Sequence, residues 1–280
     1  MTGGAGDDRF VITGGGDDVI TDFRVGRDVL DFTDANGDIN NITFTVVDNN
    51  TVIATGPGIP GGSVTINGQG VGTTNGINYL TNSSAVCFYP GTLVATPAGE
   101  RAIETLSIGD LVLTQDGRAL PVRWLGKQTV SRLFGDALRI LPIRIAAGAL
   151  GENVPARDLL VSPNHAILVE GTLVHAGALV NGTTITRERN VPMVFSYYNV
   201  ELPEHTVILA EGTPAESFVD NVERENFDNW DEHERLYGSL PSLVEMSLPR
   251  ARSHRQVPAA VRRLIAKRAE ALGVTSVAVA

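Results

Sequence analysis

Short apolar runs alternate with polar turns along most of the chain, which is the pattern of β-strands. Residues 42–47 and 51–55 flank Asp-Asn-Asn, and residues 111–114 and 166–169 each precede an Asp-Gly or Glu-Gly pair and a further apolar run. Only residues 258–273 carry apolar side chains at helical spacing, with proline near the start and glycine past the end. The apolar face of that helix would consist of Val261, Leu264, Ile265, Ala269 and Leu272. The pattern predicts an all-β protein with one C-terminal amphipathic helix.

The first thirty or so residues are repetitive. Residues 3–11 (GGAGDDRFV) match the nonapeptide G-G-x-G-x-D-x-U-x at every fixed position, and residues 13–21 (TGGGDDVIT) match it with Thr for the first glycine. The stretch 21–32 then reads as a closing turn. This segment resembles the calcium-binding β-roll of RTX-type secreted proteins, in which glycine carbonyls and aspartate carboxylates face the cation. The resemblance implies Ca²⁺ ligands at Gly6, Asp8, Gly16, Asp18, Asp22 and Asp28. The alternative is a flexible Gly/Asp-rich loop.

Charge and composition exclude several classes of protein. The formal net charge of −10 opposes nucleic acid as the main partner, since phosphate binding needs an excess of Lys and Arg. A single cysteine excludes an internal disulfide framework. No apolar run reaches the roughly 18 residues of a membrane-spanning helix. No signal peptide follows Met1, so we expect a secreted protein whose export address is C-terminal, as in type I secretion. Two repeats directly at the start suggest the tail of a longer protein.

The motifs that carry chemistry are spread over the middle of the chain. Cys87 opens C-F-Y-P-G-T, Ile108 opens I-G-D-L-V, and Ser162 opens S-P-N-H, which ends at His165. A later block reads Y-Y-N-V-E-L, then His205, then I-L-A-E-G. In this order and spacing the motifs resemble a Hedgehog/intein (Hint) domain, in particular the bacterial form found behind RTX-type calcium-binding repeats. The resemblance covers roughly residues 86–220 and implies a β-horseshoe fold.

The resemblance also implies self-cleavage. The first residue of a Hint domain makes an N-to-S acyl shift, and the histidine of its T-x-x-H box acts on the scissile amide. We therefore expect Cys87 to be the nucleophile at the Val86–Cys87 bond, His165 the acid/base and Ser162 an orienting hydroxyl. His205 stands where a later family histidine often falls and is expected to support them. Proximity is built in, because Cys87 is joined covalently to the carbonyl it attacks.

Two departures from the family limit this expectation. No His-Asn dipeptide occurs, so full splicing is not expected, and water or an unknown outside nucleophile would resolve the thioester. Residues 122–127 lack the aspartate that Hedgehog-type domains use, and Val86 is β-branched and crowds the carbonyl. The alternative function is a non-catalytic, calcium-binding adhesive module that uses the Hint fold as a scaffold. A protease acting on other proteins lacks a substrate-cleft signature.

The remaining histidines are expected to be structural. His175, His233 and His254 are interpreted as surface or turn residues, and no metal-site spacing among the histidines supports zinc. The predicted organisation is a β-roll remnant at 1–35, a β-rich linker at 36–85 and a Hint domain at 86–220. An acidic connector and the helix would fill 221–280. The substrate would be the protein's own N-terminal polypeptide, which makes the chain a self-cleaving domain and not a turnover enzyme.

Overall fold

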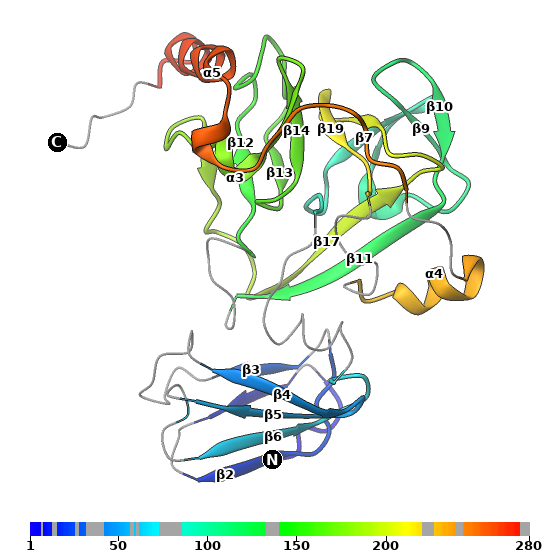
Figure 1. Ribbon diagram of the computed structural model, residues 1–280, viewed down its shortest axis with the longest axis vertical. Helices are drawn as coiled ribbons and strands as arrows, with labels where there is room; N and C mark the ends of the chain where they lie inside the picture. Colours follow the sequence, from blue (N-terminus) through cyan, green and yellow to red (C-terminus); the bar gives the residue numbers. More distant parts are fainter. Residues whose placement is uncertain are drawn as a thin grey trace, which may run out of the picture.

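The structure is a computed structural model (Figure 1). The residues that it describes are 1–6, 8–12, 16–25, 28–31, 42–56, 59, 62–72, 86–132, 140–219, 227–238 and 243–274. The fold is mostly β, as predicted. In these ranges no helix has both the length and the apolar character needed to cross a lipid bilayer.

The N-terminal region, residues 1–72, forms two small sheets. Strands β1 (Arg9–Val11) and β3 (Val29–Asp31) pair in parallel. A four-stranded sheet has the order β2-β6-β5-β4, with β2 at Asp17–Ile20, β4 at Thr43–Asp48, β5 at Thr51–Thr55 and β6 at Ser63–Asn67. The predicted hairpin is confirmed as the antiparallel pair β4–β5. In Figure 1 these strands lie together at one end of the molecule.

One buried cluster joins the repeats to the strands that follow them. Phe10 and Ile20, the large apolar residues of the two nonapeptides, are buried in it, as their position in the repeat predicts. The other fully buried members include Phe23, Leu30, Val52, Val64 and Ile66. Strand β2 also pairs in parallel with β6, so the second repeat and a later strand share one sheet. Within the predicted linker at 36–85, residues 36–41, 57–58, 60–61 and 73–85 lie outside the described residues.

The central domain, residues 86–219, is built on a seven-stranded sheet of order β20-β15-β14-β19-β18-β7-β8. Its strands are β7 (Leu93–Thr96), β8 (Gly99–Ala102), β14 (Ala166–Val169), β15 (Thr172–His175), β18 (Val207–Ala210), β19 (Thr213–Glu216) and β20 (Arg250–Ala251). The hairpin β14–β15 turns through Glu170 and Gly171, both with positive φ, as a two-residue turn of type I′ requires. Strand β20 comes from beyond the domain and pairs in parallel with β15.

Smaller sheets complete the central domain. Strands β9 (Leu111–Leu113) and β10 (Ala119–Pro121) form the second predicted hairpin. The long ribbon β11 (Trp124–Ser131) and β17 (Val194–Glu201) pairs over eight registered positions. Strand β12 (Ile143–Ile145) lies between β13 (Leu159–Val161) and β16 (Ile185–Arg187). Short helical turns occur at η2 (Ile103–Thr105) and α3 (Ala176–Leu179).

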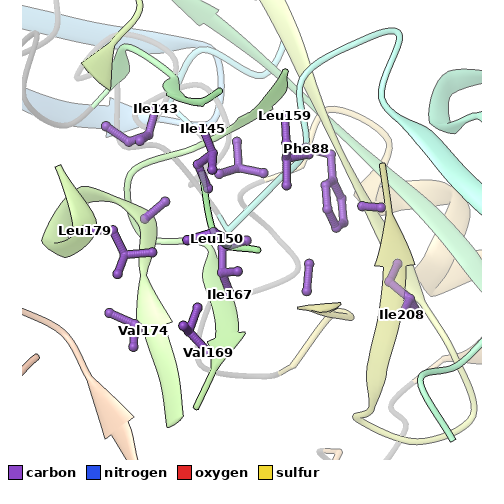
Figure 2. Packing of buried hydrophobic residues seen from close by; sticks show 14 of the residues in the cluster. Phe88, Ile143, Ile145, Leu150, Leu159, Ile167, Val169, Val174, Leu179 and Ile208 are labelled. Atoms are coloured by element: carbon purple, nitrogen blue, oxygen red, sulfur yellow. The ribbon is translucent and has the colours of Figure 1, made fainter. Parts of the chain in front are cut away.

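The core of the central domain is continuous and almost wholly aliphatic. Figure 2 shows side chains from β12, β13, β14, β15 and β18 packing together, with Phe88 at one side of the group. A second cluster lies beneath the β11–β17 ribbon and is aromatic; it contains Cys87, Trp124, Phe195, Tyr197, Phe218 and Phe227. Cys87 therefore belongs to the aromatic cluster, while its C-terminal neighbour Phe88 belongs to the aliphatic one.

Two helices follow the central domain, one predicted and one not. The predicted helix is α5 (Ala259–Ala271), preceded by the turn η4 (His254–Gln256), and it buries Val261, Ile265 and Ala269. Leu272, which the pattern placed on the same face, is 40% exposed. The other helix, α4 (Trp230–Tyr237), falls where an irregular acidic connector was predicted.

The prediction that His233 is a surface residue was wrong. Its side chain is 1% exposed, lies 3.3 Å from Glu201 and stacks on Trp230 with ring centroids 5.6 Å apart. The apolar face of α4 is made of aromatic rings, which a search for aliphatic periodicity does not detect.

Candidate functional site

Hydrogen bonds to two strands hold the segment that begins at Cys87. Phe88 exchanges both backbone hydrogen bonds with Tyr198 of β17, and the Tyr89 N–H donates to the Leu160 carbonyl of β13 at 3.0 Å. The Ser162 N–H donates to the Cys87 carbonyl at 2.8 Å. Because both neighbours belong to paired strands, residues 87–89 have little freedom to move. The peptide bond in front of them is therefore fixed within the fold.

Side chains contact both polar groups of the Val86–Cys87 peptide. The Cys87 N–H donates to Ser162 Oγ at 2.9 Å. Asn199 Nδ2 donates to the Val86 carbonyl oxygen at 2.5 Å. Both contacts are buried, and a hydrogen bond to a carbonyl oxygen in a buried site favours charge building up there. Ser162 thus lies where the sequence placed it, while Asn199 is a contact that the sequence analysis did not single out.

The turn between β13 and β14 carries His165 toward the same segment. Its Nε2 lies 3.1 Å from the Glu216 carbonyl oxygen. Since a carbonyl only accepts, Nε2 carries the proton and Nδ1 holds the lone pair. Nδ1 is buried and has no hydrogen-bond partner among the described residues. The ring packs on Phe88, with centroids 4.1 Å apart.

Burial keeps the His165 ring neutral. Removal from water lowers the pKa of His165 to about 4, although the Glu216 carboxylate and the carbonyl of Cys87 oppose this. The influence of the Cys87 carbonyl indicates that the ring faces the start of the domain. At neutral pH the imidazole therefore offers a bare nitrogen that can take a proton in this region.

The Cys87 thiol lies in a less favourable environment. The residue is fully buried in the aromatic cluster, and this desolvation, followed by the negative charge of Asp228, raises the pKa of the thiol well above its ordinary value. Asp228 precedes α4 and accepts a hydrogen bond from Thr129 at 2.5 Å. The negative charge that acts on the thiol thus comes from a segment beyond the central domain.

His205 lies one layer away from the peptide bond. Its Nδ1 accepts the Met246 N–H at 3.1 Å, and its Nε2 lies 3.5 Å from a Glu216 carboxylate oxygen. His205 thus contacts the side chain of Glu216, and the backbone carbonyl oxygen of Glu216 contacts His165 Nε2. The structure therefore places Ser162 against the Val86–Cys87 peptide bond, His165 against Phe88 and near the Cys87 carbonyl, and His205 behind them in contact with Glu216.

Glu216 is the centre of a buried polar network that the sequence analysis missed. Its side chain accepts the Ala166 N–H at 2.9 Å and two hydrogen bonds from Arg250, at 3.2 and 2.8 Å. Burial opposes ionisation of Glu216, but hydrogen bonds from His205 and Arg250 outweigh it and hold its pKa at about 2. Glu216 stands in the A-E-S stretch after the last matched motif, and no local pattern marks it as buried.

His175 and His254 differ from each other. His175 ends β15 and is partly buried, and desolvation lowers its pKa to about 4. His254 lies in η4 and is exposed, as predicted. In the described part of the chain, neither has a hydrogen bond or ion pair to Cys87.

The six residues expected to bind calcium do not gather into one group. The Gly6 carbonyl, Asp8 and Asp28 surround the guanidinium of Arg24, which lies 3.1 Å from each of the two carboxylates. Asp22 instead accepts the N–H groups of Gly3 and Gly4, and these bonds hold its pKa below the ordinary range. Asp18 lies within β2, directly after Gly16 and Asp17.

These oxygens are of the type that Ca²⁺ prefers. The convergent set of Gly6, Asp8 and Asp28 would fit a cation, and the cation found there is Arg24. No group of three or more His, Cys, Asp or Glu side chains arranged for a metal occurs in the described parts of the chain.

Comparison with known proteins agrees with the motif order. Residues 86–222 match the family model described as a Hint domain. Among solved structures, the gp41-1 intein is 17% identical, covers 47% of this chain and 98% of its own, and has a TM-score of 0.34. A DnaB intein from Synechocystis sp. is 13% identical over 48% of this chain and 100% of its own, with a TM-score of 0.33.

A bacterial intein-like domain from Clostridium thermocellum is 11% identical over 48% of this chain and 100% of its own, with a TM-score of 0.30. The comparison with curated proteins finds no match. At these identities and TM-scores, the assignment of the central domain rests on the family match.

Proposed function

We propose, on the premise that residues 86–222 form a Hint domain, that this domain cleaves its own chain at the Val86–Cys87 peptide bond. The observation that carries the proposal is the position of that bond. Its N–H meets Ser162, its carbonyl oxygen meets Asn199, and the neutral ring of His165 interacts with the carbonyl of Cys87 itself.

The first step is an N-to-S acyl shift. Cys87 Sγ bonds to the Val86 carbonyl carbon, and charge builds up on the carbonyl oxygen that Asn199 contacts. The C–N bond then breaks. The thiol proton passes to His165 Nδ1 and from there to the Cys87 nitrogen, which becomes a free amine. Ser162 holds that nitrogen in place. The product is a thioester between Val86 and the Cys87 side chain.

The second step releases the N-terminal segment. Water, or an outside nucleophile such as an amine or thiol, adds to the thioester carbonyl and breaks the C–S bond. The thiol is regenerated, and the segment ending at Val86 leaves as an acid or joined to the acceptor. Both reacting residues are buried, with Cys87 0% and Val86 5% exposed, so access of the nucleophile requires local opening.

Intact-mass measurement of the purified protein, with and without an added thiol, tests this reaction. We expect two fragments, residues 1–86 and 87–280, which appear faster with thiol. Cys87→Ala is expected to abolish both fragments. A melting temperature equal to that of the unchanged protein would show that this variant still folds. A single uncleaved species after days with thiol would rule out self-cleavage.

The second candidate function is a scaffold without chemistry. The buried thiol with a raised pKa and the β-branched Val86 favour it, because both oppose attack on the carbonyl. Under this alternative the hydrogen bonds of Ser162 and Asn199 serve only to anchor the start of the domain. The same mass measurement separates the two functions.

We further propose that residues 1–31 bind Ca²⁺ and that the protein is secreted. The two nonapeptides and the oxygens converging on Arg24 support the first part. Calcium is abundant outside cells, where weak sites of this kind fill. Circular dichroism and melting curves with calcium and with a chelator test it. Curves that coincide would contradict calcium binding.

A further inference from the structure

The segment that follows the matched family region reaches back into the site. Arg250 opens β20, which pairs with β15 at Leu173, and the Leu173 N–H donates to the Pro249 carbonyl at 2.9 Å. The Met246 N–H donates to His205. Residues 243–251 thus contribute both backbone and side-chain contacts to the central domain, although they lie beyond residue 222, where the family match ends.

The side chain of Arg250 contacts Glu216 and is largely shielded from solvent. It is 9% exposed, and its two terminal nitrogens lie 3.2 and 2.8 Å from the two carboxylate oxygens of Glu216. This bidentate geometry is the strongest form of an Arg–carboxylate contact. Glu245, which is partly exposed, also lies 2.8 Å from Arg250.

Glu216 in turn fixes the position of His165. The carbonyl of Glu216 accepts the His165 Nε2 proton, and its carboxylate accepts the N–H of the next residue, Ala166. One residue therefore holds both the ring and the backbone that carries it. If Glu216 shifts, the bare Nδ1 of His165 shifts with it.

A buried carboxylate stays in place only while its charge is balanced. The other charged or titratable groups around this pair are His165, His175 and His205, with Glu245 and Arg252 toward the outside. Among them Arg250 is the one permanent cation in contact with Glu216. Without it, Glu216 would draw a proton onto itself or onto an adjacent imidazole.

We propose that Arg250 is a positioning residue for self-cleavage, and that the segment 243–251 is part of the reacting unit although it lies outside the family match. This inference rests on the proposed function above for its effect on cleavage, but its effect on His165 is independent of it. Arg250 balances the charge of Glu216, Glu216 holds the His165 ring in its orientation, and burial together with the charge of Arg250 keeps that ring neutral.

The test measures the protonation of His165 directly, by NMR titration of its ring nitrogens. The full chain carries Cys87→Ala, so that cleavage does not interfere. The pKa of His165 is about 4 with Arg250 present, because desolvation lowers it and Arg250 adds to that effect. In Arg250→Ala it is expected to rise by about one pH unit, since a repelling cation is lost and Glu216 is left unbalanced.

Arg250→Lys keeps the charge and should restore most of the lower pKa. Arg252→Ala removes an equal charge from an exposed neighbour and should leave His165 unchanged. If Arg250→Ala does not fold, Arg250→Gln keeps the length of the side chain without its charge and replaces it. An unchanged His165 titration in a folded Arg250 variant would overturn the inference.

Cleavage provides the second measurement. With Cys87 restored, Arg250→Ala is expected to cleave about tenfold more slowly than the unchanged protein, with partial rescue in Arg250→Lys. Equal cleavage rates in the unchanged protein and in Arg250→Ala would overturn the positioning role. If the unchanged protein itself never cleaves, the proposed function fails, while the His165 titration still decides the link from Arg250 to His165.

Discussion

The N-terminal region and the central domain both bring carboxylates and an arginine together, but with different surroundings. In the N-terminal region Arg24 is about one-third exposed and lies between Asp8, which is partly exposed, and Asp28, which is buried. In the central domain Arg250 and Glu216 are buried and connect to two histidines. Solvent weakens the first group, whereas the second acts in a medium where each charge strongly affects its neighbours. Only the second arrangement can hold a reactive side chain in one orientation.

The largest effect would come from separating the two regions. Their buried clusters share no member among the described residues, so each should unfold on its own core. Phe88→Ala and Phe23→Ala each delete a fully buried ring and should cost about 3–5 kcal/mol in the region concerned. Hydrogen exchange of both variants would follow the two regions separately. Equal loss of protection in both regions from either variant would mean that they form one cooperative unit.

Acid should weaken the central domain through His165. The ring takes up a proton near pH 6.5 when unfolded but only near pH 4 when folded, so the stabilisation present above pH 6.5 is lost as the pH falls to 4. For this fully buried group the loss is about 3 kcal/mol. Urea unfolding of the Cys87→Ala protein at several pH values would measure it. His165→Gln should flatten the slope, and His254→Gln, an exposed control, should leave it unchanged.

Loss of Asn199 should slow cleavage about 10²-fold, the usual effect of removing one donor from a developing oxyanion. Asn199→Ala removes the donor to the Val86 carbonyl, and Asn199→Asp replaces it with an acceptor. Both should be slow in a mass-based time course. Asn164→Ala, at an exposed position near His165, is the control and should cleave normally. Normal cleavage in both Asn199 variants would remove this residue from the mechanism.

The smallest effect concerns calcium. If Ca²⁺ binds at Asp8 and Asp28, it must displace Arg24, so Arg24→Ala should bind calcium more tightly. The rise in melting temperature at a fixed calcium concentration should then be larger in the variant than in the unchanged protein. Arg9→Ala, on the adjacent strand β1, serves as a control for the loss of one positive charge. Identical shifts in both variants would place the calcium elsewhere.

The local sequence pattern predicted the elements whose formation depends on local interactions. The hairpins at 111–121 and 166–175 and the helix α5 follow from turn residues and apolar spacing, and they are present. The motif order placed Cys87, Ser162 and His165 in one domain, where Ser162 Oγ accepts the Cys87 N–H and the His165 N–H donates to the Ser162 carbonyl. Their chemical roles stay a prediction until cleavage is measured.

Contacts between distant segments were not predictable in the same way. Glu216 and Arg250 are 34 positions apart and look like ordinary surface charges in the sequence, yet they form a buried pair. Asn199 occupies an ordinary strand position in β17, and the residue that it contacts, Val86, is 113 positions away in the sequence. Helix α4 was missed because rings of Trp230, His233 and Tyr237 form its buried face.

The strand pairing of Phe88 also bears on reversibility. If the acyl shift occurs, the new amine of Cys87 remains tethered beside the thioester, because the hydrogen bonds of Phe88 and Tyr89 are not broken by the reaction. That amine can attack the thioester and rebuild the original amide, which is the more stable of the two linkages. The yield of released segment would then depend on the relative rates of two reactions, the return of the amine to the amide and the attack of an outside nucleophile. The solvent exposure of the thioester would therefore set the rate of irreversible cleavage.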